Sequence, residues 1–205
     1  MIWPHGRWRV ELRGEANHAG TTPLADRRDP MLDLAAFVQH ARAAAVEAGA
    51  LATVGKVRVE PNGVNAIPSH VTAWLDVRAE DEARVRAVLA ALTSWAPAEE
   101  SWTPVTWFDA DLADEVATVL GATGAGPSGS TGGARSDVRA PLLGTGAGHD
   151  AGILAAAGVP TAMLFVRNPT GVSHAPAEDA DEADCLAGVD ALATTLEHLL
   201  ARETS

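Results

Sequence analysis

The sequence lacks the residues and runs that several classes of protein need. Its 205 residues include one cysteine, Cys185, so no disulfide can form within the chain. Basic residues are scarce, 15 Lys and Arg against 27 Asp and Glu, and the net charge of -12 repels nucleic-acid backbones and anionic membrane surfaces. No apolar run approaches the roughly 20 residues of a membrane span, and the N-terminus has no signal-peptide layout. We therefore expect a cytoplasmic protein that binds neither nucleic acid nor membranes.

The sequence does contain enough apolar residues, 47%, for one good core or two small ones. Alternation of apolar and charged residues, or a β-forming composition, predicts four strands, at 7–16, 51–60, 69–78 and 102–108. Helical spacing predicts helices at 31–48, with Gly49 as C-cap, and at 80–92. The order strand, helix, strand, strand, helix, strand is that of the ferredoxin-like two-layer sandwich.

The residues after 108 have an α/β pattern that cannot complete a sheet. Helices are predicted at 112–120, 149–157 and 181–201, and one buried strand at 161–166. Residues 121–141 are rich in Gly and Ser, which is typical of a flexible loop. Because parallel strands need neighbours and helices on both faces, one strand cannot close such a layer. The sequence thus predicts a mixed α/β (α+β) chain, with a ferredoxin-like domain at 3–108 and an incomplete α/β domain at 109–205.

Seven histidines are the first candidates for chemistry, because a neutral imidazole can be a ligand, a base or a hydrogen-bond donor. Four of them fall in regular elements or near the start of the chain and are interpreted as structural: His5, His40, His70 and His198. The other three lie in loops. His18 follows the first strand, His149 enters a helix beside Asp150, and His174 follows an apolar stretch. The alternatives are a turn histidine for His18 and a helix cap for His149.

Spacing alone leaves the chemistry open. A zinc site needs three or four ligands, and the sequence has no H-x-E-x-x-H or C-x-x-C cluster. A Ser-His-Asp hydrolase is disfavoured because no G-x-S-x-G turn exists, and because Ser128 and Ser130 lie in the Gly- and Ser-rich stretch, where a nucleophile would not be preorganised.

Three motifs taken together resemble those of a known family. They are G-E-A-N-H-A-G-T-T-P followed by D-R-R-D-P, then P-N-G-V-N-A-I-P ahead of a D-V-R strand, and last G-A-G-H-D-A with G-V-S-H-A-P-A-E. In this order they resemble the zinc-dependent amidohydrolases that act on allantoate and N-carbamoyl-L-amino acids, the β-ureidopropionase-like group related to aminoacylases and carboxypeptidases. The resemblance implies a lid domain, also used for homodimerisation, over residues 3–108, and the C-terminal part of the catalytic domain over 109–205.

The resemblance also implies roles for individual residues. His18 resembles the lid histidine that reaches the partner subunit's site and stabilises the oxyanion of a tetrahedral intermediate. Asn65 and Arg78 resemble lid residues that hold the substrate carboxylate, which a guanidinium can bind with two parallel hydrogen bonds. His149 and Asp150 match a loop beside the site and are candidates for substrate contact. The implied substrate is a small ureido or amide compound that carries a carboxylate.

His174 resembles the metal-binding histidine from the C-terminal end of the family's catalytic domain, where zinc or manganese is bound. The other ligands and the general-base glutamate come from upstream segments, including H-x-D and H-I-E-Q-G motifs that this sequence does not contain. One histidine cannot hold a catalytic zinc. Two hypotheses remain open: a split or truncated enzyme that is active only with a complementing N-terminal chain, or a non-catalytic dimerisation or regulatory module or inactive fragment. The residues named do not distinguish allantoate from N-carbamoyl amino acids as substrate.

Overall fold

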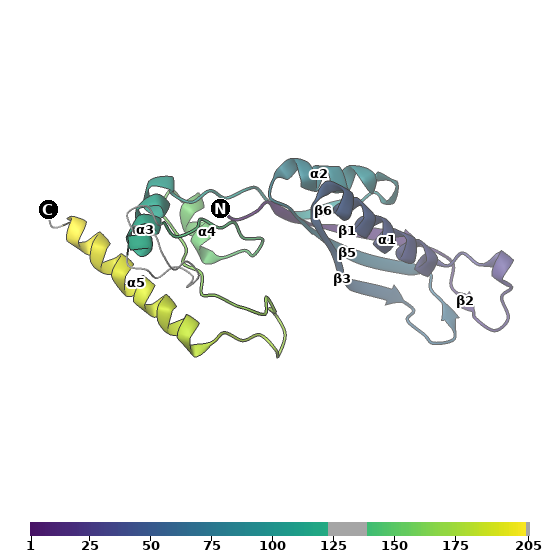
Figure 1. The fold of residues 1–205 in the computed structure, drawn as a ribbon. Coiled ribbons are helices and arrows are strands. Elements are labelled where there is room, and N and C mark those ends of the chain that lie inside the picture. Colours follow the sequence, from purple (N-terminus) through teal and green to yellow (C-terminus); the bar gives the residue numbers. More distant parts are fainter. Residues whose placement is uncertain (123–138, 204–205) are drawn as a thin grey trace. The chain divides into compact units, whose positions relative to one another are not determined.

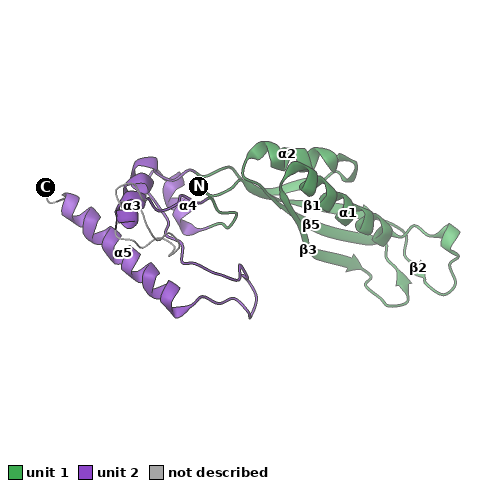
Figure 2. Ribbon diagram, viewed as in Figure 1, with its two compact units in different colours: residues 1–106, 144–148 green, residues 107–143, 149–205 purple. Residues whose placement is uncertain are grey.

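The structure is a computed structural model, and it describes residues 1–122 and 139–203. The chain forms two compact units (Figure 2). Unit 1 comprises residues 1–106 and 144–148, and unit 2 comprises residues 107–143 and 149–205. A short segment from the second half of the chain therefore belongs to the fold of the first half.

Unit 1 contains a four-stranded antiparallel sheet with two helices on one face (Figure 1). The strands are β1 (His5–Arg13), β3 (Leu51–Glu60), β5 (His70–Arg78) and β6 (Ala98–Thr103), in the spatial order β3-β5-β1-β6. The helices are α1 (Pro30–Ala48) and α2 (Glu82–Ala91). This is the ferredoxin-like sandwich that the sequence predicts, and the mixed α/β fold class is confirmed.

The sandwich forms because its strands place apolar side chains at every second position. Trp8, Val10 and Leu12 of β1 are buried, while the charged residues between them lie on the other face of the sheet. β5 lies between β1 and β3, and its Leu75 is fully buried. Phe37 of α1 is fully buried in the same cluster. The core of unit 1 therefore lies between the sheet and its two helices.

Both helices of unit 1 begin at an aspartate that caps them. Oδ1 of Asp29 accepts the backbone N–H of Met31 at 3.0 Å, and Oδ1 of Asp81 accepts that of Arg84 at 2.9 Å. α1 is followed by its C-cap Gly49, whose φ of 63° is in the left-handed region that glycine adopts without strain. The predicted helix and its glycine cap are therefore confirmed.

The last strand of the sheet lies earlier in the sequence than predicted. The 3-10 helix η2 (Thr93–Trp95) leads into β6, which ends at Thr103 instead of spanning 102–108. Pro104 follows, and it has no N–H to donate to the ladder. Beyond it Thr106 keeps an isolated pairing with Ile2. The prediction of a strand up to residue 108 is therefore wrong because it ignored this proline.

A small two-stranded sheet lies beyond one end of the main sheet (Figure 1). β2 (Asn17–His18) pairs antiparallel with β4 (Ala66–Ile67), and the 3-10 helix η1 (Leu24–Asp26) follows β2. β2 comes after β1, and β4 comes just before β5 begins at His70. We call residues 14–29 and 61–69 the tip of unit 1. The tip therefore adjoins the His70 end of β5.

The described part of unit 2 contains the helices α3 (Ala110–Ala122), α4 (Asp150–Ala156) and α5 (Glu182–Glu203). α3 packs against α5 and buries Val116 and Leu120. Glu115 of α3 accepts a hydrogen bond from Nε2 of His198 at 2.9 Å and pairs with Arg202, both on α5. The three predicted helices of this region are confirmed. In the described ranges, no helix combines the length and the apolar character that crossing a membrane requires.

The predicted buried strand at 161–166 is wrong. These residues belong to no strand, and Leu164, Phe165 and Val166 are 36%, 48% and 46% exposed. A buried strand needs neighbours that pair with its backbone and cover its side chains, and the described part of unit 2 contains no strand.

The Gly- and Ser-rich stretch at 121–141 is only partly described. Gly121 and Ala122 are the last two residues of α3, so the predicted loop begins too early. Residues 123–138 lie outside the described residues. Residues 139–141 form no helix or strand, as predicted for this stretch.

Candidate functional site

The tip brings together two of the residues singled out from the sequence, His18 and Asn65. His18 of β2 pairs with Ala66 of β4, the residue that follows Asn65. The backbone N–H of Ala19 donates to the carbonyl oxygen of Asn65 at 2.9 Å. Both candidate residues are exposed. The tip thus carries an imidazole and a carboxamide at adjacent, solvent-exposed positions.

The imidazole of His18 is oriented by its own loop. The backbone N–H of Gly20 donates to Nδ1 of His18 at 3.1 Å. A neutral imidazole that accepts a hydrogen bond at Nδ1 carries its hydrogen on Nε2. A Cβ at position 20 would lie 3.1 Å from Cε1 of His18, so a glycine permits this close approach. The loop therefore holds the ring through one nitrogen and leaves the other as the donor.

Arg27 ties the His18 loop together. Its Nη2 donates to the carbonyl oxygen of Ala19 at 2.7 Å, and its Nε donates to that of Thr22 at 3.1 Å. The hydroxyl of Thr22 in turn donates to the carbonyl oxygen of His18 at 2.8 Å. The sequence shows the D-R-R-D-P motif without revealing this role, because the contacts depend on how the loop folds back.

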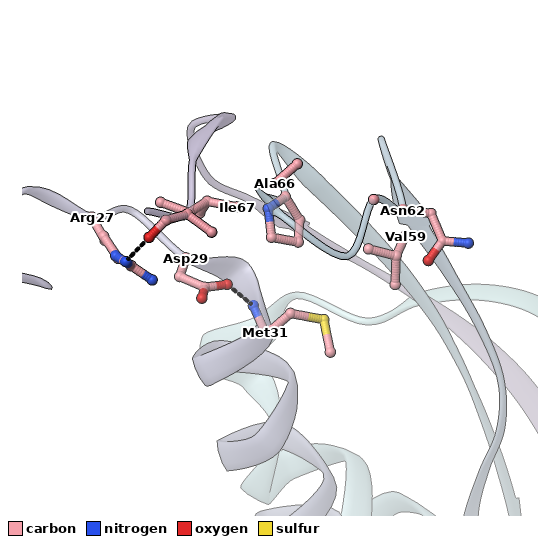
Figure 3. A pocket seen from close by; sticks show the side chains of 10 residues that line it. Arg27, Asp29, Met31, Val59, Asn62, Ala66 and Ile67 are labelled. Atoms are coloured by element: carbon pink, nitrogen blue, oxygen red, sulfur yellow. Dashed lines mark hydrogen bonds between the residues drawn. The ribbon is translucent and has the colours of Figure 1, made fainter. Parts of the chain in front are cut away.

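An open hollow of about 310 Å³ lies beside this loop (Figure 3). Its lining comes from both halves of the tip and from the neighbouring ends of α1 and β3: Ala19, Arg27, Asp29, Met31, Val59, Asn62, Gly63, Ala66, Ile67 and Pro68. Figure 3 shows Arg27 and Asp29 in hydrogen bonds with residues of this lining. Neither His18 nor Asn65 is part of it. The hollow is therefore not the candidate site itself.

Arg78, the last residue of β5, makes three hydrogen bonds. Its Nε and Nη2 donate to Oδ1 and Oδ2 of Asp76 at 2.6 and 3.0 Å, and its Nη1 donates to the carbonyl oxygen of Gly146 at 2.7 Å. The hydrogen bond to Asp76 raises the pKa of Arg78 above its ordinary value. About a quarter of the Arg78 side chain, 27%, is exposed. Arg78 is therefore a held cation that a ligand can still reach.

His18 and Arg78 lie at opposite ends of β5. The tip adjoins the strand at His70, and Arg78 is the other end of the same strand. With a rise of about 3.3 Å per residue, the two ends are roughly 26 Å apart. A ligand the size of an amino acid therefore cannot touch His18 and Arg78 of one copy at the same time.

His149, Asp150 and His174 lie in unit 2. His149 is the N-cap of α4, where its Nδ1 accepts the backbone N–H of Ala151 at 3.0 Å, and Asp150 is the first residue of the helix. His149 therefore does have the capping role that the sequence left open. His174 is exposed, and its backbone N–H donates to Oε2 of Glu178 at 2.9 Å.

The loop around His174 is held in an uncommon conformation. His174 has a φ of 59°, in a region that residues other than glycine seldom occupy. Residues that do adopt such a conformation cluster at functional sites. Oε1 of Glu178 accepts the hydroxyl of Ser173 at 3.3 Å, so one carboxylate holds two successive residues. Glu178 ends the quoted motif G-V-S-H-A-P-A-E, but the motif alone does not indicate that its carboxylate holds this loop. Across residues 1–122 and 139–203, no three His, Cys, Asp or Glu side chains converge on a possible metal position.

The four histidines interpreted as structural all have partners within the protein. Nδ1 of His5 and of His40 lie 3.0 and 2.8 Å from the carbonyl oxygens of Trp3 and Ala36. His70 pairs with Glu11, and His198 pairs with Glu115. These contacts support the structural interpretation.

The ion pair of Asp76 makes a testable prediction. Burial raises the pKa of Asp76, but its hydrogen bonds and charge interactions with Arg78 and Arg7 outweigh burial and leave the pKa below its ordinary value. Such a carboxylate stabilises the fold above its unfolded-state pKa, and this contribution is lost as the pH falls through the folded-state pKa. We expect Asp76→Asn to lower the free energy of unfolding at pH 7, with a deficit that shrinks below about pH 4. Urea unfolding at several pH values between 7 and 3 measures this loss of stability and its pH dependence. A deficit that does not vary with pH would contradict the pairing.

Comparisons with known proteins give the family of this chain. The family model for Peptidase family M20/M25/M40 matches residues 15–198. Allantoate amidohydrolase of Escherichia coli (strain K12) is 33% identical over 204 residues, which cover 94% of this chain and 47% of the relative. N-carbamoyl-L-amino acid amidohydrolase of Geobacillus stearothermophilus is 33% identical over 203 residues, which cover 97% of this chain and 47% of the relative.

A solved structure agrees with these relatives. The crystal structure of an amidase of the hydantoinase/carbamoylase family from Burkholderia vietnamiensis aligns with a TM-score of 0.79 and 29% identity, over 95% of this chain and 47% of that one. The chain thus spans about half the length of the relatives that it matches. The motifs, the fold and these matches agree, and the chain belongs to Peptidase family M20/M25/M40.

Proposed function

We propose that this chain supplies the substrate-binding part of a hydrolase that cleaves linear amide or ureido C–N bonds in small carboxylates. The two relatives are named for allantoate and for N-carbamoyl-L-amino acids, both of which carry a carboxylate and a ureido group. The observation that carries the proposal is the imidazole of His18, which is held at Nδ1 by Gly20 and offers Nε2–H from an exposed loop.

In this proposal the candidate side chains divide two tasks. The Nε2–H of His18 donates to the oxygen that gains negative charge when the substrate carbonyl is attacked, and losing such a donor costs on the order of 100-fold in rate. Arg78 and the carboxamide of Asn65 donate to the substrate carboxylate. His149 and Asp150 stay candidates for substrate contact. The cytoplasmic location that the sequence predicts also stays a proposal.

Enzymes of this family are generally metal-dependent, and the residues that the structure describes do not by themselves fit a catalytic metal. A catalytic zinc needs about three protein ligands, and within the described ranges no three suitable side chains converge. We propose that His174 supplies one ligand to a zinc or manganese ion whose other ligands lie in polypeptide beyond residues 1–205. No step of the reaction is therefore assigned to a metal held by this chain.

The surface of unit 2 supports the presence of such additional polypeptide. One row of α5 carries apolar side chains three or four residues apart, each at least half exposed: Leu186, Val189, Leu192, Leu196 and Leu200. The apolar segment 164–166 is also exposed. Soluble proteins rarely leave apolar areas of this extent uncovered. We propose that strands and helices of the remaining catalytic domain pack on these two surfaces.

This proposal predicts that the 205-residue chain alone holds far less than one zinc per molecule and does not turn over substrate. Elemental analysis of the purified chain and ammonia release from allantoate and N-carbamoylglycine measure the two quantities. The allantoate amidohydrolase of Escherichia coli, purified in the same way, is the positive control. Stoichiometric zinc together with turnover would refute the division of the site.

The second candidate function is a non-catalytic dimerisation or regulatory module, which the lack of a metal cluster among the described residues favours. The two candidate functions differ in whether the missing half of the enzyme restores hydrolysis when it is present with this chain. Coexpression with the half of an allantoate amidohydrolase that this chain does not match restores hydrolysis only if the chain contributes to a catalytic site. A His18→Ala chain is the matched control in that experiment.

We further propose that two copies pair through unit 1, because one copy cannot place its three candidate side chains around one ligand. In the ladder between β3 and β5, Leu51 lies opposite Arg78 and Glu60 lies opposite His70. Antiparallel pairing of β3 with β3 of a second copy places the Glu60 end of one strand beside the Leu51 end of the other. Each tip then lies toward the Arg78 end of the partner copy.

The edge formed by β3 has the features of such an interface. β3 is ten residues long, and its outer side has no strand partner among the described residues. Its Leu51 and Val57 are 58% and 43% exposed, and α1, which packs against β3, exposes Leu32 and Val46 at 73% and 71%. The opposite edge strand, β6, is shorter, with six residues against the ten of β3.

We expect the chain to sediment at about twice its monomer mass of 21.1 kDa, and Val57→Lys to shift it to the monomer. With the Glu60 end of one strand beside the Leu51 end of the other, position 57 lies within the pairing, and a lysine there puts a charge where an apolar side chain would pack. Ser101→Lys on β6 is the matched control and should leave the dimer intact. Equal masses for the two variants would contradict an interface at β3.

A further inference from the structure

The hydrogen bonds of Arg78 leave a defined part of its guanidinium for a ligand. A guanidinium has five N–H donors in one plane. Asp76 accepts from Nε and from Nη2, and the carbonyl oxygen of Gly146 accepts from Nη1. One N–H on Nη1 and one on Nη2 therefore remain. Each of these two N–H groups can donate to an oxygen of a carboxylate.

Asp76 is itself placed by the sheet. It lies two residues before Arg78 on β5, so both side chains point to the same face. Arg7 of β1 is the cross-strand partner of Asp76, and its Nε lies 3.5 Å from Oδ2. The Asp76 side chain is 25% exposed. Its carboxylate therefore lies between two arginines, Arg7 of β1 and Arg78 at the end of β5.

The other acceptor, the carbonyl of Gly146, is also fixed. The backbone N–H of Trp3 donates to the carbonyl oxygen of Thr145 at 2.8 Å, and the N–H of Thr145 donates to that of Met1 at 3.1 Å. A Cβ at Gly144 would lie 2.7 Å from Nε1 of Trp3, and one at Gly146 would lie 3.1 Å from its Cε3. The segment thus lies directly against the indole, which leaves the Gly146 carbonyl little freedom.

We infer that Asp76 is a positioning residue, which with the Gly146 carbonyl holds Arg78 so that two N–H groups await the carboxylate of the substrate. This inference rests on the proposed function and deepens it. A free arginine side chain loses rotamer freedom when it binds, whereas a guanidinium already held does not. Asp76 also reduces the local positive charge, which by itself weakens the attraction for an anion. The two effects have opposite signs, so the removal of Asp76 shows which one dominates.

The test is a titration of the 15N-labelled chain with N-carbamoylglycine, followed by NMR at the backbone amides of residues 77–79. The uncharged amide of the same compound is the ligand control. We expect Arg78→Lys and Asp76→Ala each to weaken binding about tenfold, and Asp76→Asn to lie between wild type and Asp76→Ala. Glu100→Ala removes a carboxylate from the same sheet and should stay within about twofold of wild type. In the Asp76→Ala chain without ligand, the chemical shift of the Arg78 Nε–Hε signal should also move to that of arginine side chains with no carboxylate partner.

One set of results would overturn only the role of Asp76, and another would overturn the carboxylate-binding role of Arg78 as well. If Arg78→Lys weakens binding and Asp76→Ala binds as well as or better than wild type, Asp76 does not position Arg78 and the inference is overturned. If Arg78→Lys binds like wild type, or if the wild-type chain does not bind the acid in preference to its amide, the carboxylate role of Arg78 fails and the inference fails with it. An unchanged Arg78 Nε–Hε signal in Asp76→Ala would also overturn the inference.

Discussion

The geometry of unit 1 depends on β5. This strand is paired with β1 on one side and β3 on the other over residues 70–78, and its Val71, Leu75 and Val77 are fully buried. It cannot bend or shorten without the loss of ladder hydrogen bonds and core contacts. The tip with His18 and Asn65 adjoins one end, and Arg78 is the other end. The distance along β5 therefore separates the two halves of the candidate site, and we propose that a second copy joins them.

At each end of β5 the candidate side chain is held before any ligand is present. Gly20 holds one nitrogen of His18, while Arg27 ties the loop that carries it. Asp76 and Gly146 hold Arg78. Prior ordering of this kind lowers the entropy that binding would otherwise cost. In unit 2, by contrast, apolar surfaces are exposed. We propose that polypeptide beyond this chain covers them.

Local patterns were sufficient to predict most of unit 1 from the sequence. The alternation at 51–60 and the glycine after α1 predict β3 and its preceding helix, since strand period and helix cap are properties of a few adjacent residues. The apolar segment at 161–166 shows the limit, because its pattern does not reveal whether another strand lies beside it. Among site residues, the motifs contain His18, Asn65 and Arg78. No pattern indicates that Arg78 donates to Gly146, 68 residues away, because that contact exists only in the folded chain.

The central claim, that one site is shared between two copies, is tested most directly by mixing two variants. Asn65→Ala and Arg78→Lys chains are unfolded together, refolded at equal concentrations, and titrated with N-carbamoylglycine. Half of the dimers formed are mixed, and each mixed dimer has one site with both residues intact. The account predicts that about a quarter of the wild-type number of tight sites returns, although neither variant alone has any. Binding equal to the average of the two separate variants would contradict it.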